Sequence, residues 1–335
     1  MATAIVAVAT AAALTGLANM SPSAGIPLAG TGTAPPGSTP APGNTASPGT
    51  ADTARGPLGG VSVLLLGDSL AAGEGAGNYF NGTDEPHQRC HRSASGWFAG
   101  TGADISNVAC SRAIVRNLQS PQQSSDFNAR AEAAQLDAMS GQSPDVTVVM
   151  LGGNDIRFAD IFNQCVLSDA DCTADLSFTA GALQSAESVS GSLAGAYRNV
   201  AARAAGKPVL VPAYPQLFDA VVGDCGRISP AEAGFARQLT ATLNASAQRA
   251  AQEASMTYPQ IRFIADTENA LEGHGACDAQ PYVHTVLPAS LLSAAQEQSA
   301  AQELLHPTAE GYKRLTEAVI KGSPDGILSV APKAG

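Results

Sequence analysis

Short apolar runs alternate with longer stretches of helical periodicity along most of the chain. The apolar runs lie at 61–66, 104–108, 146–151, 209–213 and 261–264. Runs of this length are typical of strands that are buried on both faces of a parallel sheet. Segments with helical spacing lie at about 127–139, 179–205, 230–255, 289–305 and 308–321. The alternation predicts one doubly wound α/β domain with five parallel strands, over residues 59–325.

The helix expected at 230–255 has the clearest start signal. Ser229 is followed by Pro230, and Glu232 stands three residues after the serine. This pattern is a capping box with proline at the first helical position, so we expect the helix to begin there.

The chain before and after this domain has a different composition. Residues 1–24 contain an Ala, Val and Leu run that is too short and too weakly apolar for a membrane span, and it fits the apolar core of a signal peptide. No positive charges precede this run, so we expect either that the true start lies upstream of the recorded one or that the run is an anchor lying along a membrane surface. Residues 25–58 are rich in Pro, Gly, Thr and Ser and predict a flexible linker, and residues 326–335 form a tail.

Composition narrows the classes of partner. The 335 residues are 44% hydrophobic, which is enough for a packed core. The formal net charge of -11 argues against binding to nucleic acid or to an anionic membrane surface, because both need a basic patch. We therefore expect no nucleic-acid partner and interpret the acidity as an aid to solubility.

The cysteines are even in number. Export would place them in an oxidising compartment, so disulfides and no free thiol are expected. A zinc site would need cysteines or histidines paired at close spacing, and no C-x-x-C pair is present. Counting alone leaves all fifteen pairings of six cysteines open. The six are Cys90, Cys110, Cys165, Cys172, Cys225 and Cys277.

Polar residues and glycines follow three of the predicted strands and precede the last predicted helix. In open α/β sheets ligands bind at the carboxyl ends of the strands, so these segments are expected to converge on one site. The four segments are Gly67-Asp68-Ser69-Leu70, Ala109-Cys110-Ser111-Arg112, Gly152-Gly153-Asn154-Asp155 and Glu303-Leu304-Leu305-His306-Pro307.

These segments contain the parts of a serine hydrolase site. A serine hydroxyl needs a base to remove its proton, and the carbonyl oxygen of an ester needs hydrogen-bond donors as it becomes an oxyanion. Ser69 is the candidate nucleophile and His306 the candidate base. The backbone N–H of Ser69 and the side-chain amide of Asn154 are candidate oxyanion donors. The other histidines have no acidic or cysteine partners at ligand spacing and are expected to be solvated loop residues: His87, His91, His274 and His284.

Taken together, the motifs resemble the SGNH (GDSL) hydrolase family, in its secreted bacterial lipase/esterase branch. The resemblance spans about residues 61–321 and also includes Gly73-Glu74-Gly75-Ala76-Gly77, Arg89-Cys90-His91-Arg92-Ser93 and His306-Pro307-Thr308-Ala309-Glu310-Gly311-Tyr312. It implies a flavodoxin-like three-layer α/β domain with a five-stranded, mainly parallel sheet, no metal and no cofactor. It also implies an acyl-enzyme on Ser69 with His306 as general base. Family disulfides join sequence neighbours, which implies the pairs Cys90–Cys110, Cys165–Cys172 and Cys225–Cys277.

Two residues depart from the family pattern. Arg112 stands where the family's second block usually has glycine, and its backbone N–H is still an expected oxyanion donor if the local φ suits a non-glycine residue. Its guanidinium, if it points into the site, would favour anionic esters. Glu303 stands where the family has aspartate three residues before the histidine. We expect Glu303 to orient His306, with a backbone carbonyl as the alternative.

The sequence therefore predicts a secreted serine esterase or lipase that hydrolyses carboxylic esters of a lipid, a phospholipid or an acylated glycan. The alternatives are an acyltransferase that uses the same site and a catalytically inactive envelope-binding protein. We expect a monomer that is extracellular or associated with the cell envelope. The natural substrate does not follow from the sequence, because the loops that shape the pocket decide it.

Overall fold

The computed structural model describes residues 56–125, 128–168, 170–220, 225–226, 228–285, 302–324 and 328. The predicted signal segment at 1–24 lies outside the described residues. The same holds for the predicted linker, apart from its last three residues, 56–58, and for the predicted tail, apart from Leu328.

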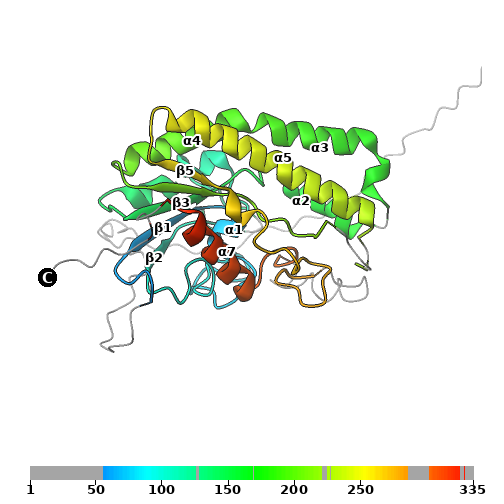
Figure 1. The fold of residues 1–335 in the computed structure, drawn as a ribbon, viewed down its shortest axis with the longest axis horizontal. Coiled ribbons are helices and arrows are strands. Elements are labelled where there is room, and N and C mark those ends of the chain that lie inside the picture. Colours follow the sequence, from blue (N-terminus) through cyan, green and yellow to red (C-terminus); the bar gives the residue numbers. More distant parts are fainter. Residues whose placement is uncertain are drawn as a thin grey trace, which may run out of the picture. The chain divides into compact units, whose positions relative to one another are not determined.

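Five strands form one sheet in which every neighbouring pair is parallel, as the apolar runs predict (Figure 1). They are β1 (Ser62–Gly67), β2 (Asp104–Asn107), β3 (Val146–Met150), β4 (Val209–Pro212) and β5 (Ile261–Ile264). Their order in the sheet is β2-β1-β3-β4-β5. Since β1 lies between β2 and β3, the chain reverses its direction of winding there. The carboxyl ends of β1 and β3 therefore flank the point at which such sheets bind ligands.

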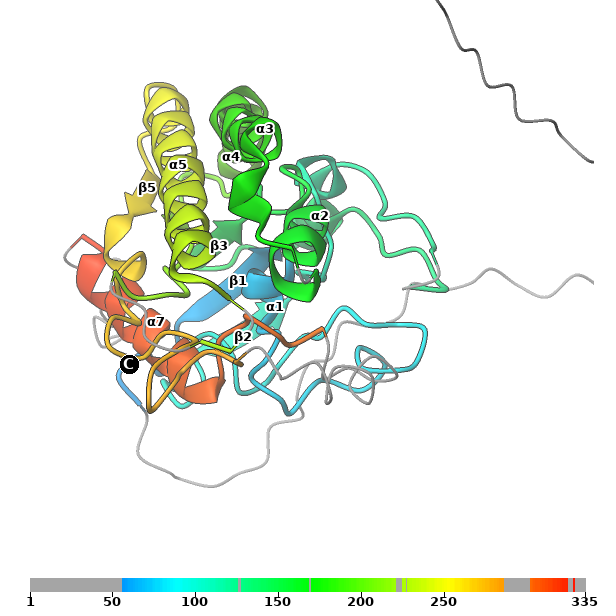
Figure 2. The same cartoon turned by 90° about the vertical axis from the view of Figure 1, so that its right-hand side faces the viewer.

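Helices cover both faces of the sheet and complete the three layers. They are α1 (Ser69–Ala72), α2 (Phe158–Phe162), α3 (Leu176–Ser188), α4 (Ser190–Arg203), α5 (Pro230–Ser255) and α7 (Ala309–Gly322). α3, α4 and α5 lie together on one face of the sheet and α7 lies on the other (Figures 1 and 2). Short 3₁₀ turns cover Val115–Leu118, Gln135–Met139, Cys172–Ala174 and Ala265–Thr267, and a π-helical turn covers Asn163–Leu167. None of the described helices is long and apolar enough to cross a membrane.

The predicted capping box is present at the start of α5. The Ser229 hydroxyl accepts a hydrogen bond from the Glu232 N–H at 3.2 Å, and the Glu232 carboxylate accepts one from the Ser229 N–H at 3.0 Å. α7 matches the helix predicted at 308–321 to within one residue at each end. The helix predicted at 179–205 is instead two helices, α3 and α4, which meet at Val189. Serine and glycine around this residue are weak helix formers, which fits a break there.

The helix predicted at 127–139 is wrong. Among the described residues of this range only Gln135–Met139 are helical, and they form a 3₁₀ turn. Asn128 forms a bridge with Gln88, and Glu132 forms one with Gln122. These long-range contacts use the backbone of an alanine-rich segment, so tertiary structure overrides its local helix propensity.

The helix predicted at 289–305 lies mostly outside the described residues, and its end at 302–305 forms turns.

All three implied disulfides are present. They are Cys90–Cys110, Cys165–Cys172 and Cys225–Cys277, and no cysteine is free. The first joins the loop that follows α1 to the loop that follows β2. The second closes the segment that contains the π-helical turn.

Candidate active site

Ser69 lies at a tight turn from β1 into α1. The turn depends on Gly67, whose φ is +146° and where a Cβ atom would lie 2.1 Å from the carbonyl oxygen of Met150. Asp68 caps α1, because its carboxylate accepts a hydrogen bond from the N–H of Leu70 at 3.1 Å. The turn therefore places Ser69 at the carboxyl end of an interior strand, as the first residue of α1.

His306 approaches Ser69 from the turn before α7. Its Nε2 lies 2.9 Å from the Oγ of Ser69. His284, which was expected to be a solvated loop residue, holds the backbone of this turn. Its N–H donates to the His306 carbonyl at 2.9 Å, and its carbonyl accepts from the Leu305 N–H at 3.0 Å. The structure thus brings together the two residues that the sequence predicts as nucleophile and base.

The ring of His306 is not oriented by Glu303. Its Nδ1 lies 3.2 Å from the carbonyl oxygen of Leu304, while the Glu303 carboxylate accepts a hydrogen bond from the Tyr79 hydroxyl at 2.6 Å. The expected carboxylate contact is therefore replaced by its backbone alternative. The physical reason is competition, because Tyr79, held in turn by the N–H of Gly75 at 2.9 Å, engages the carboxylate that was expected at the ring.

Asn154 lines the same cavity as Ser69 and His306. Its Nδ2 donates to the carbonyl oxygen of Ala113 at 3.0 Å. A side-chain amide carries two donor hydrogens, so this bond leaves one of them for a ligand in the cavity. The position fits the predicted role as an oxyanion donor.

Arg112 has a φ of +64°. This is the left-handed region, which glycine adopts freely and which costs other residues roughly 1–2 kcal/mol. Burial lowers the pKa of the Arg112 guanidinium, and the neighbouring carboxylate of Glu74 opposes this effect. The residues described as lining the cavity around Ser69 do not include Arg112. Arg112 is exposed overall and is not placed in the apolar cavity.

Tyr214, which the sequence analysis did not single out, reaches the residue next to the nucleophile. Its hydroxyl donates to the Oδ2 of Asp68 at 2.5 Å and accepts from the N–H of Gly153 at 3.1 Å. Asp68 is 2% exposed, and burial raises the pKa of its carboxyl to about 7, against the lowering effect of the Tyr214 hydrogen bond. A sequence signal was available, because Tyr214 directly follows the fourth apolar run, at the same edge of the sheet.

Glu74 and His91 form a buried pair beside the site. They are 1% and 0% exposed, so the expectation that His91 is a solvated loop residue is wrong. The Nδ1 of His91 lies 3.5 Å from Glu74, and its Nε2 lies 3.1 Å from Asp84. The Ser111 hydroxyl donates to the other oxygen of Glu74. Burial raises the pKa of Glu74, but His306, His91 and Ser111 together lower it more, so that the net shift is downward.

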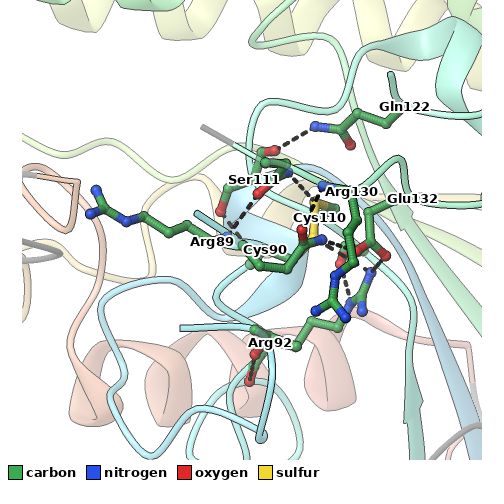
Figure 3. Close-up of a disulfide and its surroundings, with 12 residues drawn as sticks. Arg89, Cys90, Arg92, Cys110, Ser111, Gln122, Arg130 and Glu132 are labelled. Carbon is green, nitrogen blue, oxygen red and sulfur yellow. Dashed lines mark hydrogen bonds and ion pairs between the residues drawn. A yellow bond between two sulfur atoms is a disulfide. The ribbon is translucent and has the colours of Figure 1, made fainter. Parts of the chain in front are cut away.

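The Cys90–Cys110 disulfide joins two segments of the chain (Figure 3), and each of them contains a residue that contacts the carboxylate of Glu74. Each of its cysteines directly precedes a residue that contacts this carboxylate. Beside the sulfurs Arg92 forms an ion pair with Glu132 at 2.7 Å (Figure 3). The family resemblance implies this disulfide, but not the buried position of the Glu74 carboxylate beside it.

An apolar cavity opens beside Ser69 and His306. Its walls come from α2, the π-helical turn, α5 and the segment after β4. Glu232 also lines it, but its carboxylate is already engaged by the N–H of Cys172 at 3.1 Å. A cavity of this kind binds an apolar group and holds its polar end at the mouth. The apolar lining includes Phe158, Ile161, Phe162, Phe235, Leu239 and Leu243.

The chain is similar to known proteins along most of its length. The profile of the GDSL-like lipase/acylhydrolase family matches residues 65–314. A lipase of Streptomyces rimosus is 26% identical over 259 residues, which are 75% of this chain and 82% of that lipase. Lipase 2 of Streptomyces coelicolor is 28% identical over 276 residues, which are 76% of this chain and 83% of that protein.

Two solved structures share the fold. The extracellular lipase of Streptomyces rimosus superposes with a TM-score of 0.59 at 23% identity, over 78% of this chain and 100% of that one. Phospholipase A1 of Streptomyces albidoflavus NA297 superposes with a TM-score of 0.60 at 23% identity, over 78% of this chain and 99% of that one. At this identity the likeness concerns the fold alone.

Proposed function

The chain belongs to the GDSL-like lipase/acylhydrolase family and is a carboxylic ester hydrolase, and on this premise we propose that it works through an acyl-enzyme on Ser69 with His306 as general base. The observation that carries the proposal is the 2.9 Å distance between the Nε2 of His306 and the Oγ of Ser69, at the mouth of an apolar cavity.

In the first half of the reaction the Oγ of Ser69 attacks the ester carbonyl carbon while His306 takes the hydroxyl proton. The carbonyl oxygen becomes an oxyanion. We assign its donors to the N–H of Ser69, the side-chain amide of Asn154 and the backbone N–H of Arg112. His306 then returns the proton to the leaving alcohol, and the acyl group stays on the serine.

In the second half a water molecule attacks the acyl-enzyme, with His306 again as base and then as acid. The ring must present Nε2 to Ser69 throughout, so Nδ1 carries the other proton in the neutral ring. The Leu304 carbonyl, 3.2 Å from Nδ1, accepts that proton's hydrogen bond and fixes the tautomer. The site is thus a serine–histidine dyad supported by the backbone.

We propose that the substrate is a lipid or phospholipid ester rather than an acetylated glycan. The aromatic and aliphatic walls of the cavity, with no uncommitted charged group among the lining residues described above, match an acyl chain. Each methylene that such a wall removes from water contributes about 0.8 kcal/mol. A short acetyl group would leave most of the cavity unfilled.

We also propose that the enzyme acts outside the cytoplasm. Its three disulfides are of the kind that persist in oxidising compartments. The similar lipase of Streptomyces rimosus is described as extracellular.

The test is the pair of variants Ser69→Ala and His306→Ala, assayed with a soluble chromogenic ester. We expect each to lower kcat by at least ~10³-fold, because the acyl-enzyme no longer forms or forms without a base. A serine-directed phosphonate should label the wild-type protein at Ser69 and leave Ser69→Ala unlabelled. Retention of more than about a tenth of the wild-type activity by Ser69→Ala would refute the assignment, since binding alone leaves far less.

A further inference from the structure

The hydroxyl of Tyr214 lies between two segments of the site that come from different strands. It donates to Asp68 at 2.5 Å, in the turn after β1. It accepts from the N–H of Gly153 at 3.1 Å, in the turn after β3. One hydroxyl group therefore connects the residue before Ser69 to the residue before Asn154.

A third part of the chain, α5, also holds Tyr214 in place. Asn244, in the middle of α5, accepts a hydrogen bond from the Tyr214 N–H at 2.8 Å and donates to the Tyr214 carbonyl at 2.9 Å. Both residues are buried, with 3% of Asn244 and 9% of Tyr214 exposed. α5 thus holds the backbone of Tyr214, and the buried side chain reaches its two partners from this fixed point.

The turn after β3 approaches the ring closely. A Cβ atom on Gly153 would lie 3.4 Å from the Cε1 of Tyr214 and 3.6 Å from the Oδ2 of Asp68. The contacts to this side chain therefore add to the backbone hydrogen bond from the Asp68 N–H to the Met150 carbonyl, at 3.1 Å, in holding the two turns at their spacing. This spacing also sets the distance between the N–H of Ser69 and the amide of Asn154.

We propose that Tyr214 is a positioning residue for ester hydrolysis, which holds the turn of Ser69 and the turn of Asn154 at the separation that the oxyanion requires. This proposal rests on the proposed function, in which those two residues donate to the oxyanion. Tyr214 acts through them and does not itself touch the reacting atoms.

Loss of the hydroxyl has a defined consequence. Phenylalanine would leave the buried Oδ2 of Asp68 and the N–H of Gly153 without this partner, and buried polar groups without partners are costly. The two turns would relax to satisfy them. Donors that must lie within a few tenths of an ångström of the oxyanion position then lose much of their effect in the transition state, while substrate binding in the apolar cavity changes little.

The pH profile distinguishes this role from general support of the fold. Burial raises the pKa of Asp68 to about 7, and the Tyr214 hydrogen bond opposes that rise. Removing the bond raises the pKa of Asp68 further. The other groups that act on the Asp68 carboxyl are the N–H groups of Leu70 and Ala71 and the side chain of Asp155, and they remain in the variant. Tyr197 and Tyr312 are buried where they sense the charge of Asp68. In the variant the ionised carboxylate still accepts from the Leu70 N–H at 3.1 Å and so still holds the turn of Ser69. Activity should therefore be lost at a higher pH on the acid side.

The experiment compares Tyr214→Phe with a matched control, Tyr197→Phe. Tyr197 is also buried and senses the Asp68 charge, but it has no side-chain hydrogen bond to it among the described residues. For Tyr214→Phe we expect kcat to fall by about 30- to 100-fold with KM within about threefold. We also expect the acid limb of the kcat profile to move to higher pH by roughly half a unit or more. Tyr197→Phe should change neither quantity.

Two results would overturn the proposal. One is a Tyr214→Phe enzyme with kcat within about threefold of wild type, a negligible barrier change. The other is an equal loss in both variants without a shift of the acid limb, which indicates only weakened packing. Ser69→Ala is measured alongside, and activity in that variant would instead refute the proposed function. If Tyr214→Phe does not fold, Asn244→Ala serves as the second variant. It should show a smaller loss of kcat with the same direction of pH shift, and an unchanged profile would again overturn the proposal.

Discussion

Three carboxylates lie near Ser69 and His306, and they differ in their hydrogen-bond partners and in the effect of their surroundings on them. Burial raises the pKa of Asp68, and the hydrogen bonds from Tyr214, Leu70 and Ala71 offset this rise only in part. Glu74 is as deeply buried, yet the histidines and the serine hydroxyl around it lower its pKa. Glu303, the acid nearest to His306 in sequence, is engaged by Tyr79. Proximity in sequence therefore does not identify the carboxylate that acts on the histidine.

We predict that Glu303→Gln keeps kcat within about threefold of wild type, a small barrier change. The Leu304 carbonyl already occupies the Nδ1 side of His306, and glutamine keeps an oxygen that accepts from the Tyr79 hydroxyl. Steady-state kinetics with a soluble ester measure the effect. A loss of about 10²-fold or more in kcat with little change in KM is the signature of transition-state support. It would show that the Glu303 carboxylate orients His306.

The raised pKa of Asp68 predicts a pH-dependent cost to stability. Its carboxyl titrates at about 7 in the folded protein and at 3.8 in the unfolded chain. Between these values the folded state holds the extra proton, so the free energy of unfolding falls as pH rises from about 4 to about 7, by at most on the order of 4 kcal/mol. Asp68→Asn should flatten this part of the curve and be more stable than wild type at pH 8, as denaturant melts at a series of pH values would measure.

The control for this measurement is Asp145→Asn. Hydrogen bonds from Ser62 lower the pKa of Asp145, so its contribution to stability is present above the unfolded value of 3.8 and is lost below it. This variant should therefore leave the slope between pH 4 and 7 unchanged. If Asp68→Asn keeps the same slope as wild type, the Asp68 carboxyl does not titrate in that range.

At the scale of elements, α5 both contacts the segment of the second disulfide and forms part of the cavity wall. Its capping box fixes where the helix begins, and the same Glu232 carboxylate binds the N–H of Cys172 in the segment that carries the second disulfide. The next turns of α5 contribute Phe235, Ala236 and Leu239 to the cavity wall. The position of the helix start thus decides which side chains of α5 line the cavity.

We predict that Ala236→Trp shortens the acyl chain that the enzyme prefers. The indole would fill part of the cavity and displace about three methylenes of a long chain, which at about 0.8 kcal/mol each amounts to roughly 50-fold in kcat/KM. Turnover of a butyryl ester should stay within about threefold, because a short chain does not need that space. The measurement is kcat/KM over a series of nitrophenyl esters of increasing chain length.

Gln238→Trp is the matched control, because residue 238 lies on the exposed side of the same helix. It adds the same side chain and should leave the chain-length profile unchanged. Equal profiles for Ala236→Trp and the wild type would show that the acyl chain does not enter the cavity.

At the scale of the whole molecule, the sheet order brings distant parts of the chain to one edge. Ser69 follows β1, Asn154 follows β3 and Tyr214 follows β4, and these three strands are neighbours in the sheet. His306 reaches the same edge from the turn before α7, 237 residues after Ser69. Because all five strands are parallel, their carboxyl ends lie together at this edge.

The sequence by itself determined what depends on local patterns. Apolar runs gave the five parallel strands to within a residue or two, and the capping box gave the start of α5, because strand burial and helix capping are short-range signals. The motifs at the strand ends and before the last helix predicted Ser69, Asn154 and His306 as site residues, and the structure places all three around one cavity. The family resemblance supplied the disulfide pairs that the structure contains.

Only the tertiary structure decided what depends on contacts between distant segments. The segment at 128–134 forms bridges with loops elsewhere in the chain and is not helical, although its composition favours a helix. The Tyr79 hydroxyl draws Glu303 away from His306, and the burial of Asp68 and His91 follows from packing around them. These outcomes depend on which partners lie within hydrogen-bond distance of a polar group and on how much water is excluded around it. Both are properties of the assembled fold.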